Sequence, residues 1–549
     1  MEKKHLQRNA LAMAFVLLIT QLHAQTVPDA GQILQQLKPP TVPPRENELR
    51  NIQTSIPSSL VLPGGPKVML QAIHFVGNSV ISEDTLQTTL GNVTGKSFDL
   101  AGLRGLTTLI ADLYHASGFP FARAVLPPQD LQYGVLYIKI IEGRYGLVQV
   151  QAEKIEDAAQ AAPFLSNLMS GAVIETAALE RASLLLNDLP GIKSAQVISP
   201  GAQVGTGDLT VQVSRDKRIT GDVRLDNSGS RYTGQTRVLA NFNINSPFIL
   251  GDQISISTLA SDERLFQGSL SYSTPLGSSG LRGNVGYSYT SYVLAKEFAS
   301  LYANGVAKAT SVGLSYPLVR SQKRNLTLSG TYQVSYLQDN IDSTNTRTGK
   351  SSVSVPIALQ FDNRDSAGGG GITSGSVGWT LGNLKLDAAL DTYNTLGRFN
   401  KFNLDLMRLQ PLPEGFSLMG RISLQGASKN LDSSEKMSLG GPGGVRAYPT
   451  GELSGDEGVL AQLELRYNAG IYEPYVFWDV GTIKDNAKPS PTATNNKRSL
   501  SGGGVGVRFQ RNAWSGDIAL AWRGTGGAPQ SDTSSDPSSR VWALLEYKF

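Results

Sequence analysis

From about residue 218 to the C-terminus, apolar and polar residues alternate in short segments separated by glycine-rich or polar stretches. Examples are RVLANFNIN, QISISTLAS, NVGYSYTSYV, LTLSGTYQVSYL and LAQLELRY. Alternation with a period of two is typical of strands whose two faces have different surroundings. We count about sixteen such segments, which fits membrane strands of about 9–11 residues joined by turns and longer loops. The pattern therefore predicts a 16-stranded antiparallel transmembrane β-barrel over residues 218–549, with an apolar exterior and a polar lumen.

The last segment, VWALLEYKF, shows the alternation most clearly. Its apolar residues share one face, and its charged residues share the other: Val541, Ala543, Leu545, Tyr547 and Phe549 against Glu546 and Lys548. A soluble β-sandwich is the alternative, but such a fold rarely places an apolar strand at its free C-terminus with Phe last. Bacterial outer-membrane barrels commonly end in this way, which makes Phe549 the expected C-terminal assembly signal.

Residues 68–143 show mixed helical and strand patterns. VMLQAIHFVGN predicts a strand that ends in a turn at Gly77 and Asn78. Ser82 and Asp99 are expected to cap two helices, the second of which has leucine and isoleucine at helical spacing. FARAVL and GVLYIKIIEG then predict two strands. The expected order is β-α-α-β-β.

Residues 144–217 repeat that order. GLVQVQA predicts a strand, residues 164–169 a short helix and residues 175–189 a longer one, and AQVIS and LTVQVS predict two closing strands. The chain thus contains two tandem copies of one small α+β module ahead of the barrel.

The N-terminal 67 residues contain three different segments. Residues 1–24 have a basic start, an apolar core and a small-residue cleavage site, and so predict a secretory signal peptide. Within residues 25–38, Asp29 can cap a short amphipathic helix. Residues 39–67 are rich in proline and predict an extended linker.

The amino-acid composition argues against several kinds of binding and catalytic site. The 549-residue chain has a formal net charge of +4, and removal of the signal segment leaves +2, which gives no support to nucleic-acid binding. It has no cysteine, so disulfides and thiol chemistry are excluded. Only His74 and His115 lie outside the signal segment, and each is interpreted as a structural or surface residue. We expect no catalytic residue, metal site or cofactor, and no enzymatic activity.

The order of these parts resembles the outer-membrane transporters of two-partner secretion, the TpsB family, whose periplasmic modules are POTRA domains. IHFVGNSVIS is similar to the opening of a POTRA domain, and YHASGFPFARAVLPPQDLQYGVLYIKIIEG is similar to the first POTRA domain of this class. The resemblance implies POTRA 1 at residues 68–143, POTRA 2 at residues 144–217, and a plug-type helix at residues 25–38.

Within the barrel region, GGPGGVRAYPTGELSGDEG falls where this family has a Val-Arg-Gly-Tyr loop that folds back into the barrel. The resemblance assigns that functional loop to Val445, Arg446, Ala447 and Tyr448, and Ala447 departs from the family glycine. Asp479 in YVFWDVG matches the acidic position that holds the arginine. A guanidinium inside a barrel needs such a partner, and a carboxylate can accept two parallel hydrogen bonds from it.

FDNRDSAGGGGITSG resembles a second motif of the family at a strand end. Asp362, Arg364 and Asp365 match it, although the proline that often follows is missing.

The resemblance implies a bacterial outer-membrane pore with periplasmic POTRA domains. It would capture one large secreted partner, a TpsA-like haemolysin, adhesin or haem-binding protein, by addition of a strand to an exposed sheet edge. Export would proceed without nucleotide hydrolysis, because the sequence has no P-loop. Lipopolysaccharide and the barrel-assembly machinery are the other expected partners.

Three other functions are alternatives to export. A barrel-assembly insertase shares POTRA domains and the arginine loop, but such proteins more often carry three or five modules. An outer-membrane hydrolase needs a base, and the barrel region contains no histidine. A passive porin has no need of two soluble modules.

Overall fold

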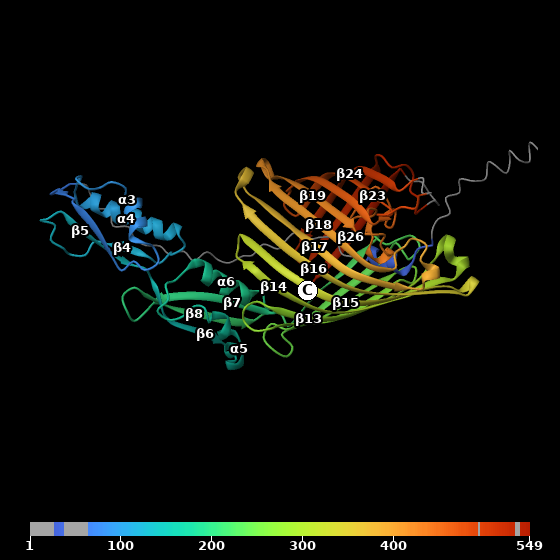
Figure 1. Cartoon of the computed structure of the whole chain (residues 1–549), viewed down its shortest axis with the longest axis horizontal. Coiled ribbons are helices and arrows are strands. Elements are labelled where there is room, and N and C mark those ends of the chain that lie inside the picture. The colour runs from blue at the N-terminus through green and yellow to red at the C-terminus, as the bar shows by residue number, and fades with distance from the viewer. Residues whose placement is uncertain (1–26, 38–63, 492–494, 533–537) are drawn as a thin grey trace, which may run out of the picture.

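The computed structural model describes residues 27–37, 64–491, 495–532 and 538–549. The expected signal peptide and most of the expected proline-rich linker lie outside these residues. In Figure 1, two small modules lie beside one end of a large barrel. No helix within the described ranges is both long and apolar enough to cross a membrane.

Sixteen strands form the barrel, each antiparallel to its neighbours. They are β9 (Ile219–Asp226), β10 (Arg237–Asn245), β11 (Gln253–Ser261), β12 (Phe266–Pro275), β13 (Arg282–Val293), β14 (Ala303–Arg320), β15 (Arg324–Ile341), β16 (Thr346–Asp365), β17 (Gly371–Leu386), β18 (Gly397–Pro411), β19 (Phe416–Ala427), β22 (Glu457–Tyr467), β23 (Tyr472–Lys484), β24 (Lys497–Arg511), β25 (Trp514–Arg523) and β26 (Ser539–Lys548). The predicted 16-stranded antiparallel barrel is confirmed.

The ring closes between the last strand and the first. Residues 544–548 of β26 pair with residues 222–226 of β9. Beyond them, the Phe549 amide donates to the Gly221 carbonyl at 3.0 Å, and the Gly221 amide donates back at 3.2 Å. The Phe549 ring lies 5.6 Å from the ring of Phe242 on β10. The terminal residue therefore completes the seam.

The faces of the strands alternate as the sequence pattern requires. On β26, Val541, Leu545 and Tyr547 are exposed on the outside, whereas Trp542 is buried inside. Because the outer surface of a membrane barrel faces lipid, exposed apolar side chains there need no protein partner.

The first module has a three-stranded sheet of order β2-β5-β4 and two helices. Its elements are β2 (Ala72–Val76), α3 (Glu83–Leu90), α4 (Leu100–Ala116), β4 (Arg123–Val125) and β5 (Val135–Ile141). Ser82 and Asp99 cap the helices as predicted.

The single strand predicted from residue 68 is wrong. The chain forms β1 (Val68–Met69), which pairs with β3 (Ser97–Phe98), and a separate β2. The break lies at Gln71, whose amide donates to the Gly134 carbonyl at 2.8 Å. That contact with a distant turn draws the backbone out of a continuous strand.

The second module repeats the topology, with sheet order β6-β8-β7. Its elements are β6 (Arg144–Ala152), α5 (Ile155–Ala161), η1 (Ala162–Leu165), α6 (Thr176–Asn187), β7 (Ile192–Pro200) and β8 (Thr206–Arg215). The short helix predicted at residues 164–169 was misplaced, because α5 and η1 occupy residues 155–165 instead. Asp157 in the first turn of α5 pairs with Arg215 at 2.7 Å, which ties that turn to the sheet.

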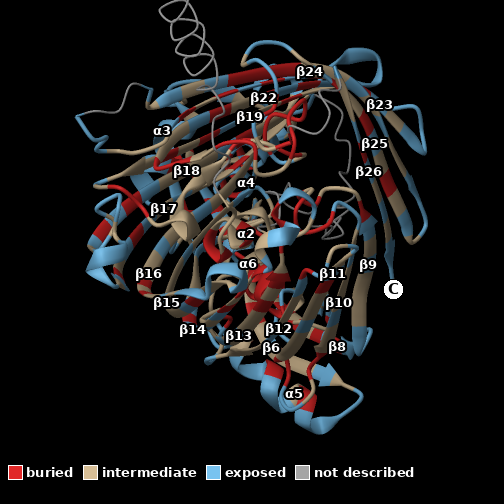
Figure 2. Ribbon diagram, turned by 90° about the vertical axis from the view of Figure 1, so that its right-hand side faces the viewer, coloured by how far each residue is buried: buried red, intermediate tan, exposed pale blue. Residues whose placement is uncertain are grey.

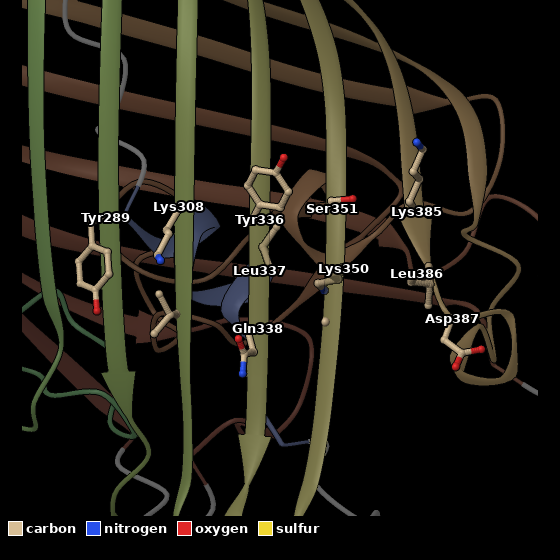
Figure 3. A pocket seen from close by; sticks show the side chains of 12 residues that line it. Tyr289, Lys308, Tyr336, Leu337, Gln338, Lys350, Ser351, Lys385, Leu386 and Asp387 are labelled. Atoms are coloured by element: carbon tan, nitrogen blue, oxygen red, sulfur yellow. The ribbon is translucent and has the colours of Figure 1, made fainter.

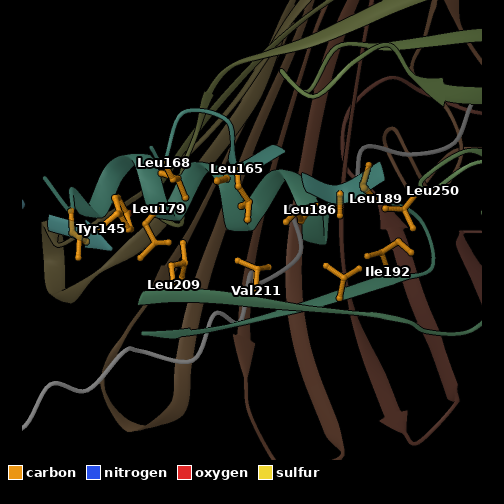
Figure 4. Close-up of a cluster of buried hydrophobic side chains, with 14 residues drawn as sticks. Tyr145, Leu165, Leu168, Leu179, Leu186, Leu189, Ile192, Leu209, Val211 and Leu250 are labelled. Carbon is orange, nitrogen blue, oxygen red and sulfur yellow. The ribbon is translucent and has the colours of Figure 1, made fainter. Parts of the chain in front are cut away.

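Module 2 is docked on the barrel. Leu250, from the turn between β10 and β11, is part of the hydrophobic core of module 2 beside Leu189 and Ile192 (Figure 4). Its amide donates to Oε1 of Gln160 at 2.8 Å. The guanidinium of Arg320, at the end of β14, binds both carboxylate oxygens of Asp188 at 2.7 Å. Hydrophobic and ionic contacts thus join module 2 to the wall.

Two segments lie inside the ring of strands (Figure 2). One is the helix α2 (Ala30–Gln36). The other, which we term the lumen loop, is the connection between β19 and β22, residues 428–456; it carries η7 (Ser433–Glu435), β20 (Met437–Ser438) and β21 (Ser454–Gly455). Shorter 3-10 turns lie in other connections: η2 (Lys296–Leu301), η3 (Asp342–Thr344), η4 (Ala367–Gly369), η5 (Ala388–Leu390) and η6 (Pro413–Gly415).

Candidate functional site

The lumen loop reverses direction at a tight turn before Arg446. The Val445 amide donates to the Leu439 carbonyl at 2.5 Å, and the Tyr448 amide donates to the Val445 carbonyl at 3.0 Å. Gly441 has a φ of 89°, a conformation that favours glycine. Val445 and Tyr448 are both fully buried. The tip of the loop is therefore folded and packed.

Arg446 and Asp479 are brought together by this turn. Arg446 donates three hydrogen bonds to the Asp479 carboxylate: from its backbone amide at 3.0 Å, from Nε at 2.8 Å and from Nη2 at 2.7 Å. Asp479 lies on β23, points into the lumen and has no exposed surface. Two of the bonds are the parallel pair that a guanidinium and a carboxylate form best.

A second carboxylate, which sequence analysis missed, completes the pairing. Nη1 of Arg446 donates to Oε1 of Glu464 on β22 at 2.6 Å. Glu464 also pairs with Arg466 at 2.7 Å and with Arg508 at 3.1 Å. The signal was present in LAQLELRY, where Gln462, Glu464 and Arg466 alternate with apolar residues and so face the lumen.

Aromatic side chains enclose the same guanidinium. Cζ of Arg446 lies 3.6 Å from the centroid of the Phe477 ring, a cation–π geometry. Nε1 of Trp542 donates to the Arg446 carbonyl at 2.7 Å. Residues of β22, β23 and β26 therefore hold the arginine through its side chain, its backbone amide and its carbonyl.

Ala447, where the family pattern has glycine, is accommodated without backbone strain. Its φ is not positive, so alanine is tolerated by the backbone. Its side chain is buried against Gly502 of β24, the residue paired with Asp479 across the sheet. Tyr448 completes the contact, because its hydroxyl donates to the carbonyls of Thr525 and Gly527 at 2.9 and 3.0 Å.

The second barrel motif lies at the opposite end of the wall, next to the modules. Arg364 pairs with Asp362 at 3.2 Å, and Nη1 of Arg364 donates to the Gln322 carbonyl at 3.1 Å. Asp365 pairs with Arg408 at 2.8 Å. These residues lie at the ends of β16 and β18, where they link neighbouring strand ends.

The helix α2 is held between the barrel wall and the lumen loop. Lys350 of β16 donates to Asp29 at 3.0 Å and to Asp432 of the loop at 2.7 Å. The Ser433 hydroxyl also donates to Asp29, at 2.6 Å, and Gln35 donates to the Ser434 carbonyl. On the wall side, the Ala30 amide donates to Asp339 at 2.8 Å. Asp29 caps α2 as predicted and also anchors it.

Among the described residues, no group of three or more histidine, cysteine or acidic side chains is placed to hold a metal ion. The lumen arrangement is one of ion pairs that position a loop and a helix.

Comparison with known proteins agrees with this architecture. A family model described as haemolysin secretion/activation protein ShlB/FhaC/HecB matches residues 205–509, and a model of the ShlB-type POTRA domain matches residues 68–143. The chain belongs to the ShlB/FhaC/HecB family. It is an outer-membrane secretion transporter whose POTRA region lies in the periplasm. The predicted family, fold and location are confirmed.

Three relatives cover nearly the same architecture. The heme/hemopexin transporter protein HuxB of Haemophilus influenzae (strain 86-028NP) is 27% identical over 526 residues, which cover 91% of this chain and 92% of the relative. The outer membrane transporter CdiB of Dickeya dadantii is 25% identical, covering 83% of each chain. The solved structure of CdiB from Escherichia coli has a TM-score of 0.72 at 20% identity, covering 90% of this chain and 93% of that one, and so supports the fold.

Family membership gives the transporter its orientation. The modules and the second barrel motif lie at the periplasmic end, and the lumen loop is an outer-side connection folded into the pore. Export of a protein through the barrel, rather than barrel assembly, is the function of this family.

Proposed function

We propose that this transporter captures one large secreted partner as an extended chain on the edge strand β7 of module 2, and then passes it through the barrel. Membership in a secretion family supports export. The free edge of β7, held beside the periplasmic mouth of the barrel, is the observation that supports capture there.

Strand β7 is nine residues long and pairs only with β8 within the described chain. The Ser194 amide donates to the side chain of Asn187 at 2.7 Å and therefore points away from β8. Because amide directions alternate along a strand, the amides of Gln196 and Ile198 also point outward. An extended peptide can add to such an edge through main-chain hydrogen bonds.

The other sheet edges of the two modules are less suitable for the addition of a partner strand. The edge of β6 is covered by residues 171–174: the Tyr145 amide donates to the Ala172 carbonyl at 2.9 Å, and the Gly171 amide donates to the Tyr145 carbonyl at 2.7 Å. In module 1, β4 has three residues and β2 has five. The length and openness of β7 favour it as the capture edge.

Passage through the pore requires free space in the lumen, where α2 and the lumen loop both lie in this structure. We propose that α2 is a plug that leaves the lumen, whereas the loop stays anchored to the wall by Arg446 and Asp479. Export would proceed without nucleotide hydrolysis, since the sequence has no P-loop.

The partner belongs to one of three proposed classes: a haemolysin, an adhesin or a haem-binding protein. The relative HuxB is a heme/hemopexin transporter, which supports the third class. Phe549, which completes the barrel seam, is proposed as the signal that the barrel-assembly machinery recognises.

Comparison of secreted proteins from cells with and without this chain tests export. Loss of one large protein from the medium, with other barrels intact, is the expected result, and a general loss of outer-membrane barrels would instead indicate an insertase.

Gln196→Pro tests the capture edge, because proline removes an outward amide without removing a bond to β8. We expect secretion to fall by about ten-fold, the effect of about one strong hydrogen bond. Gln196→Ala is the matched control and should secrete normally. Normal secretion by Gln196→Pro would exclude β7 as the edge that captures the partner.

A further inference from the structure

A groove of about 620 Å³ lies across strands β13 to β17, near their outer ends (Figure 3). Its prominent lining side chains are Tyr289, Lys308, Tyr336, Gln338, Ser351 and Lys385. Five of them form one row, because the strand register pairs Tyr289 with Lys308, Lys308 with Tyr336, Tyr336 with Ser351 and Ser351 with Lys385.

This row is on the outside of the barrel. Lys350, next to Ser351, points inward to the helix α2, and side chains alternate along a strand, so Ser351 and its row point outward. Tyr336 is 61% exposed. In Figure 3, α2 lies behind the strands that carry these side chains.

The row marks the outer boundary of the apolar surface. Four residues nearer the periplasm on these strands, the outward side chains are apolar and exposed, as at Val285, Val312 and Leu381. Strands β14 and β15 are each 18 residues long, which exceeds the roughly 9–11 residues that cross a membrane, so their outer ends rise above the hydrocarbon. Tyrosines at such a boundary lie at headgroup level.

The two lysines of the row have no ion pair or hydrogen bond to any described side chain. Asp387 lies at the end of the groove, but its carboxylate accepts a hydrogen bond from the Ala389 amide at 3.0 Å. Across three strand spacings of about 4.8 Å, Lys308 and Lys385 are about 14 Å apart. Between them, Gly349 leaves open space where a side chain would stand.

We propose that this groove binds the doubly phosphorylated headgroup of lipid A in the outer leaflet. Its two unpaired ammonium groups complement two phosphates on one headgroup. Tyr289 and Tyr336 flank Lys308 and give the glycolipid an amphipathic surface at the right depth. A singly charged phospholipid would engage one lysine only. Such a site would fix the height and tilt of the barrel next to the strands that hold α2.

Native mass spectrometry of the full chain in detergent tests this, with diphosphoryl lipid A, monophosphoryl lipid A and phosphatidylglycerol as probes. For Lys308→Gln/Lys385→Gln, we expect diphosphoryl lipid A binding to weaken about twenty-five-fold, about five-fold for each lysine. Lys217→Gln/Lys323→Gln, which removes two exposed lysines at the periplasmic end, is the matched control and should bind as the unchanged chain does.

Two results would overturn the proposal. One is equal lipid A binding by the Lys308/Lys385 double variant when gel mobility with and without heating shows that its barrel is folded. The other is equal retention of phosphatidylglycerol and diphosphoryl lipid A by the unchanged chain, which would show only general attraction of anions.

Discussion

The methyl group of Ala447 fills the space that glycine leaves open at position 502: a Cβ built on Gly502 would lie 2.3 Å from Cβ of Ala447. The alanine in the loop and the glycine in the wall are therefore complementary. Gly502→Ala should displace the loop tip and reduce secretion, with a loss of about 1–3 kcal/mol of stability from overpacking. Secretion and the thermal unfolding midpoint measure the two effects.

The double variant Ala447→Gly/Gly502→Ala checks that the contact itself is responsible. It removes the 2.3 Å clash but leaves a Cβ 2.8 Å from the Trp522 carbonyl, so rescue should be partial. A double variant no better than Gly502→Ala alone would contradict the complementarity.

Arg446→Ala should release the lumen loop from the wall. It would leave Asp479 and Glu464 buried without their shared partner, and breaking a buried pair in this way costs about 3–5 kcal/mol. We expect secretion to be lost while the barrel remains folded, as shown by gel mobility with and without heating. Arg224→Ala, which breaks the 3.4 Å pair of Arg224 with Glu546 in the lumen wall, is the control and should secrete well.

Lys350→Met should loosen the helix α2. The ammonium group of Lys350 bridges the helix at Asp29 and the lumen loop at Asp432, so its removal leaves two carboxylates close together without the cation. We expect more frequent channel openings in planar lipid bilayers. Lys323→Met, which changes an exposed lysine at the periplasmic end, should conduct as the unchanged protein does. Equal opening by both variants would show that α2 does not close the pore.

Glu142 should make the first module sensitive to acid. Burial raises the pKa of its carboxyl, but hydrogen bonds from the Ser79 hydroxyl and the Ser79 and Val80 amides outweigh burial and hold the pKa below 4.5, the ordinary value. A lowered folded-state pKa stabilises the fold above the ordinary pKa, and this stabilisation is lost as the pH falls through the folded-state value.

Hydrogen exchange of the Ser79 and Val80 amides in the full chain measures this effect. Glu142→Gln should exchange faster at pH 7, and the difference from the unchanged chain should shrink below pH 4.5. A difference that stays constant down to pH 3 would contradict the role of the charge.

The features predicted best from the sequence were those determined by residues close together in the chain. Ser82 and Asp99 cap their helices because the capping bond joins residues three apart. The strand alternation of the barrel follows from the period of two. The misplaced helix in module 2 and the break at Gln71 depend on Arg215 and Gly134, which are far away in the sequence.

In the candidate site, too, some contacts could be predicted from the sequence and others could not. The contact of Arg446 with Asp479 was expected from the family resemblance, but the pattern of residues gave no reason to place Phe477 or Trp542 beside the arginine. Both come from strands whose position relative to the loop is fixed only when the ring closes. The function of these residues in secretion is a prediction that the variants above test.

Leu250 has a mechanical consequence. Because this side chain of a barrel turn is part of the core of module 2, the module cannot swing freely on a hinge. Tension applied to β7 by a bound chain would pass through that core and the Arg320–Asp188 pair into β10, β11 and β14. β14 in turn touches α2. Tension at the periplasmic edge of module 2 would therefore reach the helix α2 inside the barrel through the barrel wall.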